Sequence, residues 1–380
     1  MSTKIPRSIK ALDDIYGMRF LVRTGFNVPI IDGEVQSAYR IKSAIPTILH
    51  LVERGARVII LTHVGRDPKN STRPLLDVLN KFAPTTYVDA VLGEKAHGAV
   101  MHMKEGTVLL LENLRACDGE VNNDEELAKT LASYGNFYVN EAFSVSHREH
   151  ASIVTLPKLL PNFAGLSLLA EQEKLTRALS PEEPSLFILG GAKFETKEPL
   201  IEKYADKYTN VFVGGALAND FFKAKGYEVG TSLLSTIDLN DSAVSEKDNI
   251  LLPVDVIASS DKENRQADCN KVESTEKIVD AGNKTIEMLA PYIAQAKTIL
   301  WNGPLGSYDE GFDEATKACA KLIAQSNAFS VVGGGDTIAA IESLELEDNF
   351  GFLSTGGGAM LKFLENGSLP GIDALTDSNS

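Results

Sequence analysis

Basic side chains recur in the first half of the chain, each just after a short apolar run or at the start of a helical pattern. In chain order they are Arg40, His63, Arg66, Arg115 and Arg148. The carboxyl ends of parallel strands meet at one edge of a sheet, so residues that follow successive strands converge there. The planar arginine fork suits carboxylate and phosphate oxygens held by two hydrogen bonds. This spacing predicts a crevice for a small phosphorylated or carboxylated anion.

Glycine clusters end four apolar runs in the second half. The clusters are Gly190 with Gly191, Gly214 with Gly215, Gly333 to Gly335, and Gly356 to Gly358. Glycine lets backbone N–H groups approach phosphate oxygens, and a helix that begins there adds a favourable dipole. Neither the P-loop string GxxxxGK[ST] nor a GxGxxG string after a strand occurs. Four clusters in one domain therefore predict a nucleotide site of another kind.

Charged residues follow two of these clusters. Lys193 and Lys197 are four residues apart, so on a first helical turn both ammonium groups face the same side. Asp336 comes directly after Gly335, where an aspartate serves either as a ligand of Mg²⁺ or as the cap of a helix. The pattern alone leaves both roles of Asp336 open.

Alternating strand-like and helix-like segments must position these groups. The expected strands are 19–26, 58–62, 108–111 and 137–139 in the first half, and 186–189, 210–213, 250–256, 298–301, 329–332 and 350–353 in the second. Helical periodicity runs over 41–54 and again over 168–179, before Ser180 and Pro181. This order predicts an α/β protein of two Rossmann-like, three-layer αβα domains with mainly parallel sheets. We expect the domains at 1–165 and 181–366, joined by an interdomain helix and hinge at 166–180.

Composition excludes several classes of protein. With 380 residues, 43% of them apolar, and glycine and proline spread without period, the chain is neither disordered nor collagen-like. The net charge of −15 disfavours a nucleic-acid or membrane-surface partner, although residues 1–165 carry +1 and the remainder −16. The three cysteines have no CxxC spacing, and no apolar run reaches the length of a membrane span of about 18 residues. We therefore expect a cytoplasmic protein with small-molecule partners.

Taken in order, these strings resemble one family along nearly the whole chain, phosphoglycerate kinase. The matching N-terminal strings begin at Asn27, Asp32, Arg40, Pro46, His63, Glu112, Ala142 and His147. The matching C-terminal strings begin at Gly190, Gly214, Ala218, Trp301, Gly333 and Ser354. The resemblance implies two domains around a cleft that close about the hinge, with residues 367–380 returning to the first domain, and a monomer.

The reaction that the resemblance implies is reversible transfer of the ATP γ-phosphoryl group to the carboxylate of 3-phosphoglycerate, with Mg²⁺ bound to the nucleotide. Carried over by position, the phosphoglycerate ligands would be Asn27, Arg40, His63, Arg66, Arg115 and Arg148. The residues facing ATP or ADP would be Lys193, Lys197, Gly214, Asp309, Gly334, Gly335, Asp336 and Thr337, with Asp336 on the metal. Arg40, Lys197 and the amide of Gly357 would stabilise the transferring group.

The sequence departs from the family pattern beside Asn27. Gly25 stands where the family has an aspartate that accepts a hydrogen bond from the substrate's 2-hydroxyl, and Ser144 stands where it has glycine. Loss of that acceptor is expected to cost about 1.5–3 kcal/mol of substrate binding. Two alternatives remain beside the kinase: a kinase for a related phosphorylated acid without the 2-hydroxyl, and a noncatalytic nucleotide-binding paralogue. A nicotinamide dehydrogenase is disfavoured by the absent dinucleotide string.

Overall fold

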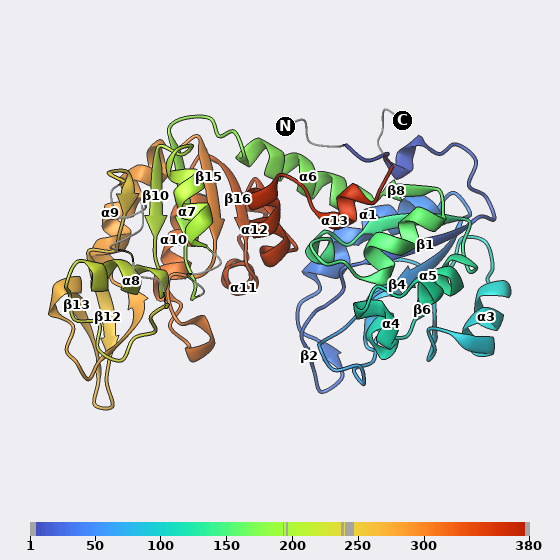
Figure 1. The fold of residues 1–380 in the computed structure, drawn as a ribbon, viewed down its shortest axis with the longest axis horizontal. Helices are drawn as coiled ribbons and strands as arrows, with labels where there is room; N and C mark the ends of the chain where they lie inside the picture. Colours follow the sequence, from blue (N-terminus) through green and yellow to red (C-terminus); the bar gives the residue numbers. More distant parts are fainter. Residues whose placement is uncertain (1–4, 193, 195–196, 237–238, 240–246, 377–380) are drawn as a thin grey trace. The chain divides into compact units, whose positions relative to one another are not determined.

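The structure, a computed structural model, describes residues 5–192, 194, 197–236, 239 and 247–376. The chain forms two compact units (Figure 1). The first comprises Met1–Glu173 with Asn366–Ser380, and the second comprises Lys174–Glu365. The division falls within helix α6 (Leu166–Ala178), so this helix belongs to both units.

A six-stranded parallel sheet forms the centre of the first unit. Its strand order is β5 (Thr85–Val88), β6 (Val108–Leu111), β4 (Arg57–Leu61), β1 (Arg19–Thr24), β7 (Phe137–Glu141) and β8 (Asn162–Ala164). A short antiparallel hairpin, β2 (Ile30–Ile31) with β3 (Glu34–Val35), follows β1.

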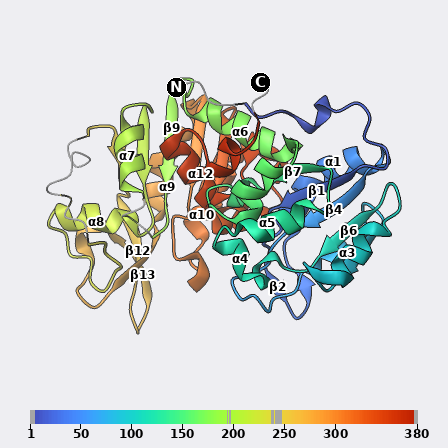
Figure 2. The same cartoon turned by 45° about the vertical axis from the view of Figure 1, so that its right-hand side comes forward.

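Helices cover both faces of this sheet. Because successive strand residues point to opposite faces, Phe20 and Val22 share one core with helices α1 (Tyr39–Val52) and α2 (Leu75–Leu79). Arg23 points to the other face, where the segments are α3 (Gly93–Met101), α4 (Asp118–Val121), α5 (Glu125–Ala132) and the π-helical turn Ala151–Thr155. Helices α4 and α5 lie side by side (Figure 2).

The last described residues pack on the first unit. Helix α13 (Pro370–Asp373) is fixed there because Gly371 N donates to Ser146 O at 2.8 Å and Asn140 Nδ2 donates to Gly371 O at 3.1 Å. Farther on, Thr376 N donates to Asn162 Oδ1 at 2.7 Å. Three apolar side chains of this segment are buried: Leu369, Ile372 and Leu375.

The second unit repeats the architecture. Its parallel sheet has the order β11 (Ile250–Leu251), β10 (Asn210–Val213), β9 (Ser185–Leu189), β15 (Thr298–Asn302), β16 (Phe329–Gly333) and β17 (Phe352–Leu353). The helices are α7 (Glu198–Ala205), α8 (Leu217–Ala224), α9 (Asn283–Gln295), α10 (Glu314–Ala324), α11 (Gly335–Glu342) and α12 (Gly357–Asn366). Helix α10 packs between α9 and α11. The predicted α/β class with two mainly parallel sheets is confirmed.

Proline breaks one predicted strand. The run 250–256 was expected to be a single strand, but Pro253 has no N–H for a ladder and separates β11 from β12 (Asp255–Ser259). Strand β12 instead joins an antiparallel sheet between β13 (Asn264–Asp268) and β14 (Lys277–Ala281), which the sequence did not predict. Within the described residues, no helix is both long and apolar enough to cross a membrane.

Candidate active site

The turns after β1 and β4 are tied to each other in the first unit. Thr62 Oγ1 donates to Thr24 O at 3.1 Å and accepts from Phe26 N at 3.2 Å. Asn27 Oδ1 accepts from Gly65 N at 2.8 Å, and Asn27 O accepts from Arg40 Nη1 at 2.5 Å. Asn27 thus fixes both the β4 turn and the guanidinium of Arg40, which is partly buried at the start of α1.

The turn after β6 is anchored to the same β4 turn. Asn113 Nδ2 donates to Val64 O at 2.9 Å and to Asn70 O at 2.8 Å, while its Oδ1 accepts from Arg115 N at 3.0 Å. Arg115 Nη1 in turn donates to Gly65 O. Three successive strand ends are therefore cross-linked through side-chain amides and guanidinium groups.

A buried polar layer supports these turns from below. Arg23, only 1% exposed, donates to Ser152 Oγ at 2.8 Å, and its Nη2 lies 3.3 Å from His63 Nδ1. Ser152 Oγ donates to Glu120 Oε1 at 2.6 Å, and the same carboxylate lies 3.7 Å from His150 Nδ1. Arg23 and Glu120 form a 3.9 Å ion pair.

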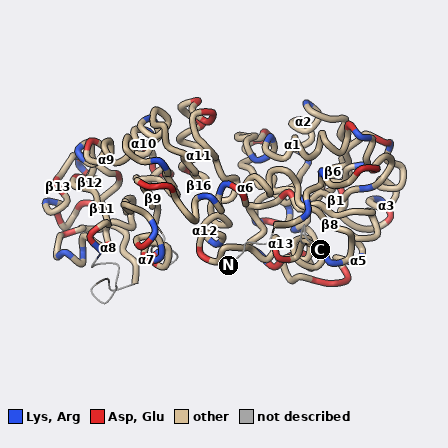
Figure 3. The backbone as a smooth tube through the Cα atoms, turned by 90° about the horizontal axis from the view of Figure 1, so that it is seen from above, with Lys and Arg blue, Asp and Glu red and all other residues tan. Residues whose placement is uncertain are grey.

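Positive charge accumulates at this edge. Burial lowers the pKa of Arg115, and the neighbouring charges of Arg148 and Arg66 lower that pKa further. Burial and Arg66 lower the pKa of Arg148 in the same way. Along the chain, Lys and Arg are spread over both units rather than gathered in one stretch (Figure 3), so the fold itself brings these arginines together. An anionic ligand would relieve their mutual repulsion.

The histidines of this edge are neutral at neutral pH. Burial, followed by the charges of Arg23 and Arg115, lowers the pKa of His63 to about 2. Burial and Arg23 also lower the pKa of His150 to about 4. His63 is therefore a neutral hydrogen-bonding group, and the cationic charge of the edge comes from arginine.

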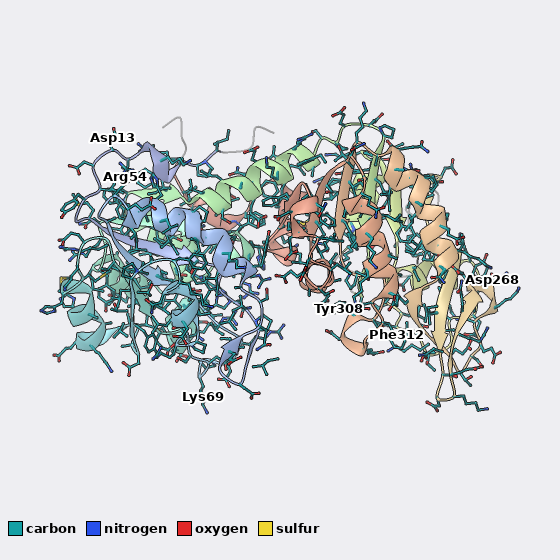
Figure 4. The ribbon with its side chains drawn as sticks, turned by 180° about the vertical axis from the view of Figure 1, so that it is seen from behind. Asp13, Arg54, Lys69, Asp268, Tyr308 and Phe312 are labelled. Atoms are coloured by element: carbon teal, nitrogen blue, oxygen red, sulfur yellow. The ribbon has the colours of Figure 1, made fainter. Side chains whose placement is uncertain are left out.

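The second unit contains a pocket of about 470 Å³ at the carboxyl ends of its strands. Its wall includes Gly191, Gly215, Asn219, Pro304, Asp309 and Asp336. Tyr308, labelled in Figure 4, also lines it, on the 3₁₀ turn Tyr308–Glu310. A pocket of this size holds a compound the size of a nucleotide.

Glycine is required where three loops of this pocket cross. A Cβ on Gly190 would lie 2.2 Å from Pro304 O, and a Cβ on Gly303 would lie 2.4 Å from Gly190 O. Gly215, at φ +60°, would place a Cβ 2.6 Å from Gly191 N. Backbone therefore packs directly on backbone beneath the pocket.

Asp336 lines the pocket, whereas Lys197 lies next to the wall, with its Nζ 2.8 Å from a Cβ built on Gly191. Lys197 is the residue before α7 and only 7% exposed, and its ammonium donates to Gly190 O. Asp336 is in the first turn of α11, where Gly334 is the N-cap residue and no side chain caps the helix. Burial and the charge of Asp309 raise the pKa of Asp336, whereas Lys197 lowers it. Lys193 lies outside the described residues.

Two helices begin next to each other at this site. A Cβ on Gly357, the first residue of α12, would lie 2.9 Å from Gly334 Cα, just before α11 begins at Gly335. Such N-termini favour anions. Thr337 is fully buried behind Gly334, and its hydroxyl has no hydrogen-bond partner in the part of the chain that the structure describes.

The residues that line the pocket differ in part from those predicted to face the nucleotide. Gly214 lies behind the pocket wall, with its N–H bonded to Leu189 O at 2.8 Å, and Gly215 forms the wall instead. No sequence pattern predicted Arg23, Glu120 or Asn219 as site residues. The strand pattern could have identified Arg23, because Leu21 and Arg23 are two residues apart in the strand and so point to the same face of the sheet.

Comparison with known proteins agrees with this geometry. The sequence profile of the family described as phosphoglycerate kinase matches residues 9–367. The phosphoglycerate kinase of Methylorubrum extorquens is 40% identical over 96% of this chain and 98% of its own length, and that of Dictyoglomus turgidum is 41% identical over 96% and 97%.

Solved structures give the same result. The chain superposes on phosphoglycerate kinase from Coxiella burnetii with a TM-score of 0.80 at 36% identity, covering 97% of this chain and 98% of that one. Against the Pyrococcus horikoshii enzyme the TM-score is 0.86 at 30% identity, with the same coverage. With both sheets, the glycine-lined pocket and the arginine edge (the strand ends that carry Arg66, Arg115 and Arg148) in place, this chain belongs to the phosphoglycerate kinase family.

Proposed function

We propose that each unit binds one substrate of the family's reaction. The arginine edge of the first unit binds the phosphorylated acid, and the pocket of the second unit binds the nucleotide. As a member of the family, the chain phosphorylates 3-phosphoglycerate with ATP, a step of glycolysis. The proximity of Arg66, Arg115 and Arg148, whose charges lower the pKa values of Arg115 and Arg148, is the observation that supports the assignment of the acid.

Arg66, Arg115 and Arg148 bind the phosphate of 3-phosphoglycerate in this proposal. Arginine is suited to this because each guanidinium presents two parallel donors to a phosphate. Neutral His63 adds a hydrogen bond without charge. Asn27 and Arg40, which are hydrogen-bonded to each other, bind the carboxylate that accepts the phosphoryl group in this proposal.

Transfer to a carboxylate needs neither a side-chain nucleophile nor a general base, since the acceptor is ionised at neutral pH. Catalysis then consists of positioning and of stabilising the charge that spreads over the transferring group. Lys197, Arg40 and the N-terminal amides of α12 at Gly357 supply that stabilisation. Gly334, Gly335, Thr337 and Asp309 shape the nucleotide side.

Asp336 is the residue that would hold Mg²⁺. This ion takes one or two protein carboxylates and completes its octahedral shell with phosphate oxygens and water, so the carboxylate of Asp336 on the pocket wall fits this role. When bound with the nucleotide, Mg²⁺ neutralises phosphate charge. Asp309 lines the same pocket and raises the pKa of Asp336. The same cation would reduce the repulsion between these two carboxylates.

We further propose a cytoplasmic monomer that acts on small molecules, without nucleic-acid or membrane partners. The net charge of −15 opposes binding to polyanions. The three cysteines are free thiols, of which Cys269 and Cys319 are buried, as suits a reducing compartment.

Initial rates of ADP formation from MgATP across a 3-phosphoglycerate titration test the function. We expect saturation for the natural protein and, for Arg115→Ala, a rise in KM of roughly ten- to a hundredfold, because a charge-assisted contact of about 1.5–3 kcal/mol is removed. Lys81→Ala, which removes an exposed charge at the end of α2, is the control and should keep the natural KM. If the natural protein binds MgADP but forms no ADP from MgATP and 3-phosphoglycerate, the assignment of the substrate is contradicted.

A further inference from the structure

The hydroxyl of Ser144 occupies the space that a side chain at position 25 would fill. A Cβ built on Gly25 would lie 2.4 Å from Ser144 Oγ and 3.7 Å from Ser144 Cβ. Strands β1 and β7 are paired with Thr24 opposite Glu141, so the residues that follow each strand meet across the sheet edge. Any residue larger than glycine at position 25 must therefore displace this hydroxyl.

Hydrogen bonds hold the turn that carries Ser144. The turn is the 3₁₀ segment Phe143–Val145, in which Val145 N donates to Ala142 O at 3.1 Å. Ser146 N donates to Phe143 O at 3.0 Å, and Arg148 N donates to Val145 O at 3.0 Å. The backbone position of Ser144 is thus linked to that of Arg148, one of the proposed phosphate ligands.

The Ser144 hydroxyl is available to a ligand. It makes no hydrogen bond to any residue that the structure describes, and the side chain is partly exposed. Ser146 and Ser152, on the same stretch of chain, are by contrast buried and bonded: Ser146 Oγ donates to Ala142 O at 3.0 Å and Ser152 Oγ to Glu120.

The chemistry of the acceptor matches this arrangement. In 3-phosphoglycerate two charged groups flank one neutral hydroxyl on the central carbon. The arginines suit the charged ends, whereas the neutral hydroxyl is best met by a group that both donates and accepts. Ser144 is such a group, and its turn is linked to Arg148 by the bond from Arg148 N to Val145 O and lies beside the segment that leads to Asn27.

We propose that Ser144 is a specificity-determining residue, which binds the hydroxyl of the phosphorylated acid in the space that Gly25 leaves open. This inference rests on the proposed function. It revises the expectation that Gly25 simply removes one substrate contact: the contact is moved from the β1 turn to the β7 turn and changes from a carboxylate to a hydroxyl. Gly25 and Ser144 then form a matched pair.

The kinetic test uses two acceptors: 3-phosphoglycerate and its analogue without the 2-hydroxyl, 3-phosphonooxypropanoate. For Ser144→Ala we expect the ratio of kcat/KM between the two to fall roughly two- to tenfold, as for loss of one neutral hydrogen bond, with the value for the analogue unchanged. Ser144→Thr retains the hydroxyl and should retain the ratio. Ser133→Ala, an exposed serine after α5, is the matched control.

A double-mutant cycle tests the pairing. Gly25→Asp alone should lose kcat/KM for both acceptors, since its Cβ meets Ser144 Oγ, whereas Gly25→Asp with Ser144→Gly should recover turnover of 3-phosphoglycerate. An unchanged ratio in Ser144→Ala, or a single Gly25→Asp variant equal to the double variant, overturns the proposal. Thermal unfolding and MgADP binding of each variant identify effects of misfolding.

The failure of the proposed function gives a different result. If the natural protein phosphorylates neither acceptor, the kinase assignment is wrong, and calorimetric binding of both acids to the natural protein and to Ser144→Ala then decides this inference. A preference for the hydroxy acid that disappears in Ser144→Ala supports it. Equal dissociation constants in both proteins reject it.

Discussion

Lys197 places a single positive charge beside the pocket proposed to bind the nucleotide. It precedes α7, is almost completely buried, and donates to the carbonyl of Gly190 in the glycine turn after β9. A lysine that is desolvated in this way interacts strongly with phosphate oxygens, because little water screens the charge. The position of its ammonium group depends on the turn after β9, and that turn requires glycine at position 190.

Lys197→Met should abolish most of the transfer while the fold survives. Removing one preorganised charge from a transition state costs about 10²- to 10³-fold in kcat, and the methionine fills similar volume. We expect a smaller change in KM for ATP. Steady-state kinetics with Lys321→Met, an exposed lysine on α10, as control would check this; a kcat within threefold of the natural protein contradicts the role.

Glu141 is a second buried residue, and its burial changes its pKa. It ends β7, its Oε1 accepts from Thr47 Oγ1 and Ser167 N at 3.0 Å each, and its Oε2 has no partner among the described residues. Burial, only partly offset by these hydrogen bonds, raises the pKa of Glu141 from 4.5 to about 8. Glu141 is therefore protonated at neutral pH in the folded chain.

The stability of the protein should fall as pH rises through the pKa of Glu141. Because its folded pKa exceeds its unfolded one, the stabilising effect of the proton is complete below about pH 4.5 and lost as pH passes about 8. Glu141→Gln lacks that loss, so its melting temperature relative to the natural protein should be higher at pH 9 than at pH 6. Glu149→Gln, an exposed residue, is the control; parallel curves for Glu141→Gln and the natural protein would refute this.

At the scale of elements, the second unit depends on strands that end in glycine and helices that begin beside them. The turns after β9, β10 and β15 cross at backbone distance, and α11 and α12 begin where a Cβ on Gly357 would meet Gly334. Side chains at these positions would separate the turns. The repeated glycine clusters are thus explained by packing as well as by access of N–H groups to phosphate.

Gly215→Ala should both destabilise the second unit and weaken nucleotide binding. Its φ of +60° and the 2.6 Å approach to Gly191 N make alanine strained, at a cost of about 1–3 kcal/mol. Thermal unfolding and calorimetry with ADP would measure the two effects. Gly98→Ala in α3, where a Cβ meets nothing within 4 Å, should be neutral or stabilising; equal behaviour of the two variants contradicts the crossing of the turns as the cause.

At the scale of the whole molecule, the chain leaves its first unit within α6 and returns after α12. The returning segment contributes three buried apolar residues and hydrogen bonds to Asn140 and Asn162. The returning segment therefore stabilises the unit that carries the arginine edge.

Deletion of residues 367–380 should destabilise the first unit. Loss of Leu369, Ile372 and Leu375 removes apolar burial on the order of 5 kcal/mol, and it leaves buried amides unbonded. We expect unfolding of this unit at lower temperature and loss of 3-phosphoglycerate binding, while ADP binding by the second unit survives. A chain that ends at Thr376 is the control; unchanged melting of the longer deletion would exclude a structural role of the segment.

The sequence alone determined the elements and the chemical character of each half. Strands β6 and β10 have the predicted bounds, and α1 covers most of the predicted helix 41–54. Arg66, Arg115, Arg148 and the glycine clusters follow the strands after which they were predicted. These features depend on periodicity and on turn residues within a few positions, which a local pattern encodes.

Which distant side chains meet depends on the tertiary fold. Strand order and the register of β1 with β7 bring Arg23, Glu120 and Ser152 together in the buried layer. They also place the Ser144 hydroxyl next to Gly25. Neither is encoded in a local pattern, because a strand carries the same alternation whichever neighbour it pairs with. The sequence therefore predicted the loss of one substrate contact at Gly25, whereas the structure places the Ser144 hydroxyl, on the turn after β7, in the space beside Gly25.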